Sequence, residues 1–334
     1  MKSNRKIRFG IIGCSRIGAR STIPAIINSE FAELKMIGSR SIKKSEKFVK
    51  KFGCENFGTY NDVIQSEEVD AVYISLPIGL HEEWSIKASE VGKHVLCEKS
   101  STTSYYSAKL MIESSKKNNV RIMEGFMFKF HPQHKKVLEF INSNKIGKPF
   151  VFCGSYGFPP ISKDDIRYNP ELGGGVLNET GCYPIYSSRI IFQSEPIGVL
   201  CNLYKDEKVG VDTKGHAYIL YKEGKTAFVA FGFENFYQAN YRIWGSKGTI
   251  ELDRAYAVPP DFSPTIKIQN DEINEKINVK PVDHFKIMIN EFCSKLNDPS
   301  DSSKWEEDLL NQARLMEALR VSSNEKRFVN LSEI

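Results

Sequence analysis

A glycine-rich turn follows the first apolar run of this sequence. Its letters are GIIGCSRIG, in which Gly13, Ser15 and Gly18 take the three positions of the dinucleotide fingerprint G-x-G-x-x-G. The first glycine of that fingerprint permits a tight turn, the second lets the backbone approach a pyrophosphate, and the third lets the helix lie close to the strand. Ser15 stands at the second position, where its hydroxyl can hydrogen-bond a phosphate but its Cβ takes up clearance. The turn predicts a dinucleotide site, the alternative being an ordinary strand-to-helix turn, and the expected contacts are Gly13, Ser15, Arg16, Ile17 and Gly18.

The next strand-like run ends in Ser39 and Arg40, and Lys44 follows shortly after. A site for NAD usually has an aspartate or glutamate here, which accepts hydrogen bonds from the ribose 2′-hydroxyl. An arginine beside a hydroxyl suits a 2′-phosphate instead, because the guanidinium forms a charge-assisted fork with it. Since no acidic residue is present, we expect NADP(H) as the cofactor. The other interpretation of this basic stretch is a solvated, lysine-rich helix face.

Two later segments place polar residues directly after strand-like runs. DAVYISL ends in Leu76 and leads into Pro77 and His81, and HVLC leads into Glu98 and Lys99. The strand ends of an open parallel sheet line its ligand crevice, so all five residues are expected near the cofactor. A lysine in such a crevice can donate a proton or stabilise a carbonyl oxygen that gains negative charge. The alternatives are a surface lysine and a histidine that begins a helix without contacting a ligand.

The first 125 residues alternate between strand-like and helix-like segments, which predicts βαβ units and a parallel sheet. The expected strands are Ile7–Gly13, Phe31–Ser39, Asp70–Leu76, His94–Cys97 and Val120–Glu124. The expected helices are Pro24–Asn28, Lys43–Phe52, His81–Val91 and Tyr105–Lys117.

After about residue 147 short strand candidates separated by turn signals predict an antiparallel sheet. They are Phe150–Tyr156, Ile197–Tyr204, Ala217–Lys222, Ala227–Phe233, Tyr241–Trp244 and Thr249–Leu252. One helix is expected at Leu177–Phe192, and two amphipathic helices at Asp283–Leu296 and Trp305–Ser322. The prediction is therefore an α/β Rossmann-type domain at residues 1–126 and an α+β domain with an open antiparallel sheet at residues 127–334.

Composition excludes several classes of protein. The net charge of +5 is too small to indicate a nucleic-acid partner by itself, although residues 1–51 hold thirteen Lys/Arg and three Glu, a net of +10 that favours an anionic ligand. The seven cysteines form no C-x-x-C pair, which argues against a disulfide scaffold or a zinc ribbon and favours a reducing compartment. His131 and His134 have no evident companion ligand, so no metal site is expected. The sequence shows no signal-peptide or transmembrane stretch, and a cytoplasmic protein without a membrane partner is expected.

Taken together, the motifs resemble the Gfo/Idh/MocA oxidoreductase family along essentially the whole chain. They are GIIGCSRIG, the Ser-Arg after the second strand, LPIGLH, GKHVLCEKS, EGFMFKFHP and GGGVLNETGCYP, in that order. The resemblance implies hydride transfer between a nicotinamide and the carbon of a sugar or similar polyol. It also implies a C-terminal open sheet that is often used for oligomerisation, and hence a homodimer or homotetramer.

The same resemblance assigns site residues. The family's E-K-P lysine falls on Lys99, with Ser100 in place of the proline, which leaves the backbone less restrained. Tyr183 falls on the acid/base position, and Glu179 takes the position of the usual aspartate, four residues earlier on one helical face. A tyrosine, with a pKa of about 10, becomes an effective acid or base when a nearby ammonium stabilises its phenolate, and Lys99 would supply that charge. Arg167 and Glu179, with Tyr183, are expected at the substrate.

The Tyr variant resembles two subgroups of the family. One contains 3-ketoreductases of nucleotide-linked deoxysugars, to which RSTIPAI and LPIGLHEEW look closest. The other contains the NADP-dependent trans-dihydrodiol and D-xylose dehydrogenases. The sequence-based expectation is an NADPH-dependent reductase of a sugar ketone, with a dehydrogenase of the second subgroup as the alternative. The alternative from another class is a non-catalytic NADP-binding regulatory protein, against which the presence of both Lys99 and Tyr183 argues.

Overall fold

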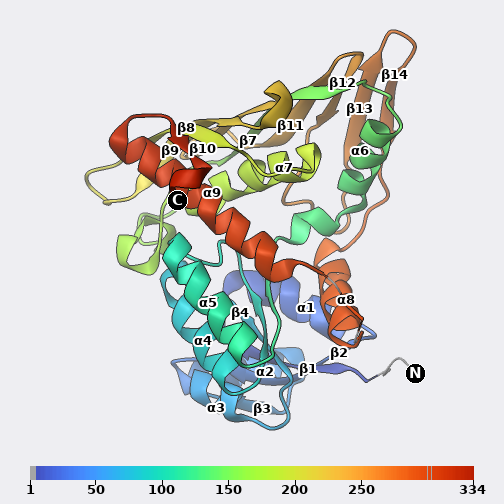
Figure 1. Cartoon of the computed structure of the whole chain (residues 1–334). Helices are drawn as coiled ribbons and strands as arrows, with labels where there is room; N and C mark the ends of the chain where they lie inside the picture. The colour runs from blue at the N-terminus through green and yellow to red at the C-terminus, as the bar shows by residue number, and fades with distance from the viewer. Residues whose placement is uncertain (1–4, 299, 302) are drawn as a thin grey trace. The chain divides into compact units, whose positions relative to one another are not determined.

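The chain folds into two compact units in the computed structural model, which describes residues 5–298, 300–301 and 303–334 (Figure 1). The first unit comprises residues 1–127 and 284–310, and the second comprises residues 128–283 and 311–334. The end of the first segment lies within two residues of the expected boundary. The expected second domain was one continuous stretch, whereas residues 284–310 pack with the first unit.

A six-stranded parallel sheet forms the centre of the first unit, in the order β3-β2-β1-β4-β5-β6. The strands are β1 Ile7–Ile12, β2 Ala32–Gly38, β3 Asn56–Gly58, β4 Ala71–Ile74, β5 His94–Cys97 and β6 Ile122–Glu124. This is the Rossmann order, and the direction of strand succession reverses between β1 and β4. In folds of this kind ligands bind at the carboxyl ends of the strands beside such a reversal. The Gly13 turn follows the carboxyl end of β1 and therefore lies at that position.

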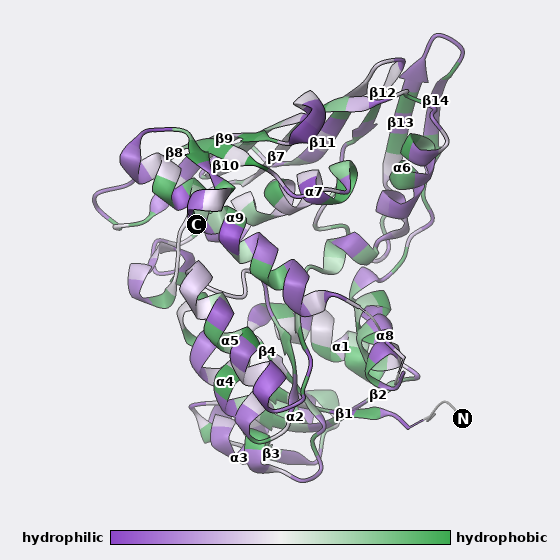
Figure 2. Ribbon diagram, in the orientation of Figure 1, coloured by the Kyte–Doolittle hydropathy of each residue, from purple (hydrophilic) through white to green (hydrophobic). Residues whose placement is uncertain are grey.

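Helices connect the parallel strands of this sheet. They are α1 Ile23–Ile27, α2 Ile42–Phe52, α3 Tyr60–Gln65, α4 His81–Glu90 and α5 Tyr105–Lys117, and α8 His284–Leu296 joins them later in the chain. Figure 2 shows hydrophilic and hydrophobic residues alternating along α4 and α5, as expected of helices with one face on a sheet. In α4 the buried positions include His81, Ser85 and Ala88, which recur at intervals of four and three residues.

Residues 284–310 pack with the first unit because an aromatic and ionic cluster holds them there. The ring of Phe292 lies 5.9 Å from that of Phe9 on β1 and is stacked on Trp305 at 5.4 Å. The Arg121 guanidinium lies 4.6 Å from the centre of the Trp305 ring and binds Asp301 at 2.6 Å and Glu306 at 2.8 Å. Sequence periodicity reports only that α8 has an apolar face, so it could not indicate which unit covers that face.

A nine-stranded sheet dominates the second unit, in the order β14-β13-β12-β11-β7-β10-β9-β8-β15. The strands are β7 Pro149–Phe158, β8 Gly198–Lys205, β9 Asp212–Leu220, β10 Thr226–Phe233, β11 Gln238–Gly245, β12 Gly248–Leu252, β13 Thr265–Asn270, β14 Asn274–Asn278 and β15 Val329–Asn330. The sheet is largely antiparallel, as expected, but β7 and β10 pair in parallel. Strand patterns do not report pairing partners, and these two strands are separated by α7, β8 and β9, which allows the parallel arrangement.

The helices of the second unit are α6 Pro132–Asn142, α7 Cys182–Phe192 and the greater part of α9 Trp305–Glu325. The end of α9 covers part of the edge of β8, where the hydroxyls of Ser322 and Ser323 accept the main-chain N–H groups of Cys201 and Leu203. Unpaired N–H and C=O groups at a strand edge can pair with another chain. The two serine hydroxyls satisfy two such N–H groups of β8. Within the described part of the chain, no helix has both the length and the apolar character needed to cross a bilayer.

Candidate active site

The glycine-rich turn lies at the carboxyl end of β1, where it leaves little room for side chains. Gly13 has a φ of 106°, which favours glycine, and its N–H donates to the carbonyl oxygen of Gly38 at 3.1 Å. A Cβ at Gly13 would lie 2.9 Å from a methyl group of Leu76 at the end of β4. The turn therefore presents bare backbone between β1 and β4, as the pyrophosphate of a dinucleotide requires.

Ser15 caps the turn from the position that usually carries the second glycine. Its hydroxyl oxygen accepts the N–H of Gly18 at 2.9 Å. The hydroxyl hydrogen of Ser15 is donated to no acceptor in the part of the chain that the structure describes. A serine hydroxyl can accept and donate at the same time, so Ser15 can hold the turn together and still bind a phosphate oxygen.

Two π-helical turns lie at the predicted functional motifs, one at Gly18–Thr22 and one at Leu177–Gly181. A proline follows each of them, Pro24 and Pro184. Proline has no N–H and its ring crowds the carbonyl four residues earlier, so a regular α-helical ladder cannot continue through it. The predicted single helix over residues 177–192 is therefore a π turn followed by α7, a difference that periodicity alone does not reveal. Such turns occur frequently at functional sites.

The end of β2 brings the predicted 2′-phosphate residues together. Ser39 is buried, whereas Arg40 and Lys44 are exposed. Burial raises the pKa of Cys14 in the glycine-rich turn. The positive charge of Lys44 and a hydrogen bond with Ser39 lower that pKa in part, so Lys44 and Ser39 both lie beside the turn. Tyr60 at the start of α3 was not predicted: its pKa is raised by burial and lowered by the nearby Arg40. Residues 39–44 carry Arg40 and two lysines and include no acidic residue, which fits a phosphate group better than a ribose hydroxyl.

His81 is placed at the end of β4 as predicted, but its ring is engaged with the protein backbone. The side chain is 1% exposed, and burial lowers the pKa of the imidazole. Its Nε2 lies 2.8 Å from the carbonyl oxygen of Leu76 and its Nδ1 lies 3.0 Å from that of Ser100. The imidazole thus joins the end of β4 to the segment after Lys99, and sequence spacing gave no sign of this role.

Glu98 and Lys99 follow β5 directly, at the same edge of the sheet. Glu98 is buried and its Oε1 accepts a hydrogen bond of 2.5 Å from the hydroxyl of Tyr73, whereas Lys99 is half-buried. The peptide bond between Lys99 and Ser100 is cis. Gly13, Leu76 and Lys99 therefore lie at the carboxyl ends of β1, β4 and β5, three adjacent strands of one sheet.

In the second unit Tyr183 lies in the first turn of α7, within a cluster of aromatic rings. Its side chain is 5% exposed. The ring centroids of Tyr156, Phe128 and Tyr256 lie 5.0, 5.6 and 5.6 Å from that of Tyr183. Packing on three sides leaves the ring few alternative rotamers, so the phenol group is held in one orientation.

Arg167 and Glu179, both predicted at the substrate, bind each other. Nε of Arg167 donates to Oε2 of Glu179 at 3.2 Å, and its Nη1 donates to Asp165 at 2.9 Å. Burial alone would lower the pKa of Arg167, but the two carboxylates outweigh it and raise that pKa. Two carboxylates already balance the guanidinium charge, so Arg167 orients Glu179 and is poorly suited to bind a phosphate.

The segment between Arg167 and Tyr183 is fixed by residues that sequence reasoning missed. A Cβ at Gly175, whose φ is 120°, would lie 2.3 Å from the carboxylate of Asp212. That carboxylate accepts the N–H of Leu177 at 2.7 Å, and Arg320 on α9 donates to the side chain of Asn178 at 2.6 Å. Asp212 and Arg320 lie far along the chain, and no local motif marks them.

Tyr186, one turn further along α7, is bound by a lysine of its own unit. Nζ of Lys129 donates to the hydroxyl of Tyr186 at 2.9 Å, and Tyr186 is 4% exposed. The predicted pair was Lys99 and Tyr183; Lys129 lies in the motif EGFMFKFHP, but the sequence analysis gave it no role. Tyr186 therefore provides an internal comparison for any role given to Tyr183.

His131 and His134 both form hydrogen bonds with other groups of the second unit. Nε2 of His134 lies 2.8 Å from the carbonyl oxygen of Ala255, and its Nδ1 lies 3.0 Å from the hydroxyl of Tyr241. Among the residues that the structure places, no group of three or more His, Cys, Asp or Glu side chains could hold a metal ion.

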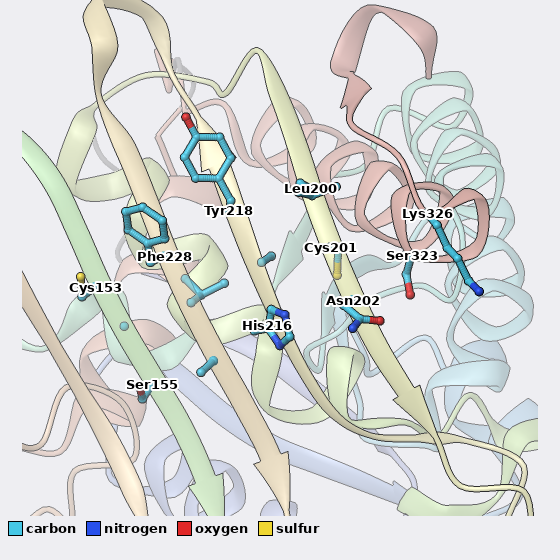
Figure 3. Close-up of a pocket in the computed structure, with 14 residues that line it drawn as sticks. Cys153, Ser155, Leu200, Cys201, Asn202, His216, Tyr218, Phe228, Ser323 and Lys326 are labelled. Carbon is cyan, nitrogen blue, oxygen red and sulfur yellow. The ribbon is translucent and has the colours of Figure 1, made fainter.

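A cavity of about 810 Å³ lies on the second unit, and none of the predicted site residues is among those that line it. Figure 3 shows its lining on adjacent strands, with Cys153 from β7, Phe228 from β10, Tyr218 and His216 from β9, and Ser323 and Lys326 at the end of α9. Large apolar side chains are exposed on this sheet, with Leu200 at 46% and Phe228 at 48%, and Trp244 on the neighbouring β11 at 56%. Large apolar side chains are therefore exposed on three strands of this sheet, β8, β10 and β11.

Both units match models of known protein families. Residues 7–126 match the model of an oxidoreductase family with an NAD-binding Rossmann fold, and residues 134–251 match the Gfo/Idh/MocA C-terminal domain. The chain is 33% identical to dTDP-3,4-didehydro-2,6-dideoxy-alpha-D-glucose 3-reductase of Actinomadura kijaniata over 324 residues, which cover 96% of this chain and 97% of the relative.

Other relatives extend this similarity. The crystal structure of a 3-ketoreductase from Actinomadura kijaniata in complex with NADP and TDP-benzene is 33% identical, with a TM-score of 0.91 over 95% of this chain and 98% of that one. D-xylose 1-dehydrogenase (NADP(+)) 2 of Haloferax volcanii is 29% identical over 97% of this chain and 99% of the relative. The similarity thus covers both units and extends to two different sugar oxidoreductases.

Proposed function

This chain belongs to the Gfo/Idh/MocA oxidoreductase family, and we propose that it reduces a ketone of a nucleotide-linked sugar with NADPH. The observation that carries the proposal is the similarity to dTDP-sugar 3-reductases along almost the full length of both proteins. The residue content agrees, because Lys99 and Tyr183 are both present and the Tyr183 ring is packed among other aromatic rings.

The residues of the first unit fit NADPH. The bare backbone at Gly13 and the hydroxyl of Ser15 suit a pyrophosphate, and Ser39, Arg40 and Lys44 suit a 2′-phosphate. When bound, the cofactor supplies the hydride. Arg16, Ile17 and Gly18 complete the pyrophosphate turn, and Leu76, Pro77 and Glu98 line the carboxyl edge beside it.

The chain's own part of the chemistry is the handling of charge and protons at the carbonyl oxygen. Tyr183 donates the proton that this oxygen takes up as the carbonyl carbon is reduced to an alcohol carbon. Lys99 stabilises the negative charge that develops on the same oxygen. Arg167 orients Glu179, whose carboxylate accepts a hydrogen bond from a hydroxyl of the sugar.

The direct test is NADPH consumption with nucleotide-linked 3-keto sugars, free sugars and small dicarbonyls, followed by the absorbance of the nicotinamide. Turnover confined to the nucleotide-linked ketones is the expected result. The second candidate is a D-xylose or trans-dihydrodiol dehydrogenase, favoured by the 29% identity to the xylose enzyme. It predicts oxidation of free xylose or of a trans-dihydrodiol with NADP. Cofactor binding without turnover of any compound would favour a regulatory protein.

Replacing Arg40 tests the choice of cofactor. Arg40→Ala removes a charge-assisted hydrogen bond worth about 1.5–3 kcal/mol, so NADPH binding is expected to weaken by roughly 10- to 100-fold. Binding of NADH, which lacks the 2′-phosphate, should change little. The measurement is quenching of protein fluorescence by each cofactor. Lys50→Ala, which removes an exposed charge paired with Glu46 on α2, is the control; equal losses for both variants would contradict the role of Arg40.

The exposed face of the nine-stranded sheet is proposed to bind a second copy of the chain, giving a homodimer or homotetramer. Its apolar side chains Leu200, Phe228 and Trp244 would be covered by such an interface. Phe228→Glu places a charge in that face and is expected to yield monomers in sedimentation velocity. Phe236→Glu changes a loop phenylalanine that is 85% exposed and should leave the assembly intact. A monomeric wild-type protein would contradict the proposal.

The cysteines favour a reducing compartment for this protein. All seven cysteines are free thiols in the structure, and six of them are buried. We place the protein in the cytoplasm on this basis, because thiols stay reduced there.

A further inference from the structure

Three buried side chains hold the loop that carries Lys99. They are Tyr73 on β4, His81 at the start of α4 and Glu124 at the end of β6, and we call them the three anchors. Their exposed fractions are 0%, 1% and 7%. Each comes from a different element of the first unit, and none of them was singled out by its sequence context as a support for the lysine.

Tyr73 holds the residue before the lysine. Its hydroxyl donates to Oε1 of Glu98 at 2.5 Å and accepts a hydrogen bond of 3.0 Å from Thr22 in the π turn. Its ring also underlies that turn, because a Cβ at Gly18 would lie 3.6 Å from its edge. Burial and the Glu98 carboxylate raise the pKa of Tyr73 well above its usual value, so the hydroxyl keeps its proton and remains a donor. Tyr73 therefore joins the helix after the glycine-rich turn to the lysine loop.

The other two anchors hold the residues after the lysine. Nδ1 of His81 lies 3.0 Å from the carbonyl oxygen of Ser100. The N–H of Ser101 donates to Oε1 of Glu124 at 2.7 Å. Tyr73 thus holds the side chain of Glu98, whose Oε2 also accepts the N–H of Lys99 at 3.3 Å. His81 and Glu124 hold the backbone of the two residues after the lysine.

We propose that Tyr73, supported by His81 and Glu124, is a positioning residue that fixes the backbone of Lys99 so that its ammonium meets the carbonyl oxygen of the substrate. The inference rests on the function proposed for Lys99. A lysine side chain has four rotatable bonds, so its ammonium is placed accurately only if its backbone is fixed. A displacement of about 1 Å in a catalytic group can cost about 10²-fold in rate.

Tyr73→Phe is the first test, because it removes the hydroxyl and keeps the ring. We expect kcat to fall by about 10- to 100-fold, while the Kd of NADPH, measured by fluorescence quenching, changes by less than about threefold. Tyr221→Phe is the matched control. Tyr221 is also buried, at 1% exposure, and its hydroxyl lies 2.6 Å from that of Ser188 in the second unit. If both variants lower kcat equally, the effect is a general loss of stability and the proposal fails.

A double-mutant cycle with Lys99→Ala separates positioning from a merely structural role. If Tyr73 acts through Lys99, adding Tyr73→Phe to Lys99→Ala lowers kcat no further. If Lys99→Ala alone is slow and the double variant loses the product of the two single-variant factors in kcat, the inference is overturned and the role of Lys99 stands. Normal turnover of Lys99→Ala alone would overturn the role of Lys99 and, with it, this inference.

Glu124 provides a second variant pair within the same design. Glu124→Gln keeps an oxygen that can accept the Ser101 N–H, so kcat is expected to stay within about threefold of the wild-type value. Glu124→Ala removes the acceptor and is expected to lower kcat as much as Tyr73→Phe. Circular dichroism verifies that both variants fold. Equal rates for the glutamine and alanine variants would overturn the anchoring role.

Discussion

Tyr183→Phe is expected to lower kcat by about 10²–10⁴-fold, the contribution of a proton donor to such a step. The phenylalanine ring keeps the contacts with Tyr156, Phe128 and Tyr256, so the fold and the Kd of NADPH should change little. The measurement is the rate of NADPH oxidation with a saturating nucleotide-linked keto sugar. Cofactor binding, followed by fluorescence, separates a lost proton donor from a damaged protein.

Tyr186 provides the control for this prediction on the same helix. It is buried to the same degree as Tyr183, and its hydroxyl accepts a hydrogen bond from Lys129. Tyr186→Phe should therefore cost stability and leave kcat within about tenfold of the wild-type value. If Tyr186→Phe were the slower variant, the lysine–tyrosine pair of the reaction would be Lys129 and Tyr186, and the assignment to Tyr183 would be wrong.

Lys99→Ala is expected to lower kcat by about 10²–10³-fold, the cost of removing one stabilising group from a developing oxyanion. The substitution leaves room for a small cation where the lysine side chain was. Methylammonium added to the assay is therefore expected to restore part of the lost rate, and sodium at the same ionic strength is not. The measurement is kcat as a function of methylammonium concentration.

A matched lysine on the surface distinguishes this effect from a change in overall charge. Lys87 on α4 is paired with Glu83 and is partly exposed, so Lys87→Ala should leave kcat unchanged. Turnover of Lys99→Ala close to that of Lys87→Ala would remove Lys99 from the mechanism.

The parallel sheet of the first unit could be predicted because buried strands and amphipathic helices leave different periods in a sequence. Five of its strands were expected close to their observed bounds. The exception, Asn56–Gly58, has three residues, and two of them are exposed, so it carries no apolar run. The hairpin Thr265–Asn270 and Asn274–Asn278 was missed because β14 forms the polar edge of its sheet.

Other features could not be predicted because they depend on which segments meet. The chain returns to the first unit at residues 284–310, where Phe292 packs against Phe9. The parallel pairing of β7 with β10 likewise joins strands far apart in the sequence. Periodicity reports that a face is apolar, but the partner that covers that face is chosen only when the whole chain packs.

The residues of the candidate cofactor site could be proposed from local sequence, because the approach of a backbone to a pyrophosphate and the binding of a phosphate require particular residue types at fixed local spacing. Gly13, Ser15, Ser39 and Arg40 were selected in this way, whereas Lys99 and Tyr183 were assigned their roles by the resemblance to the family. The contacts that hold these residues depend on how distant segments pack together. Tyr73 reaches Glu98 across 25 residues, and Arg320 reaches Asn178 across 142. Such long-range contacts leave no periodic trace in the sequence, since any residue with the right hydrogen-bonding group can make them once the fold brings it near.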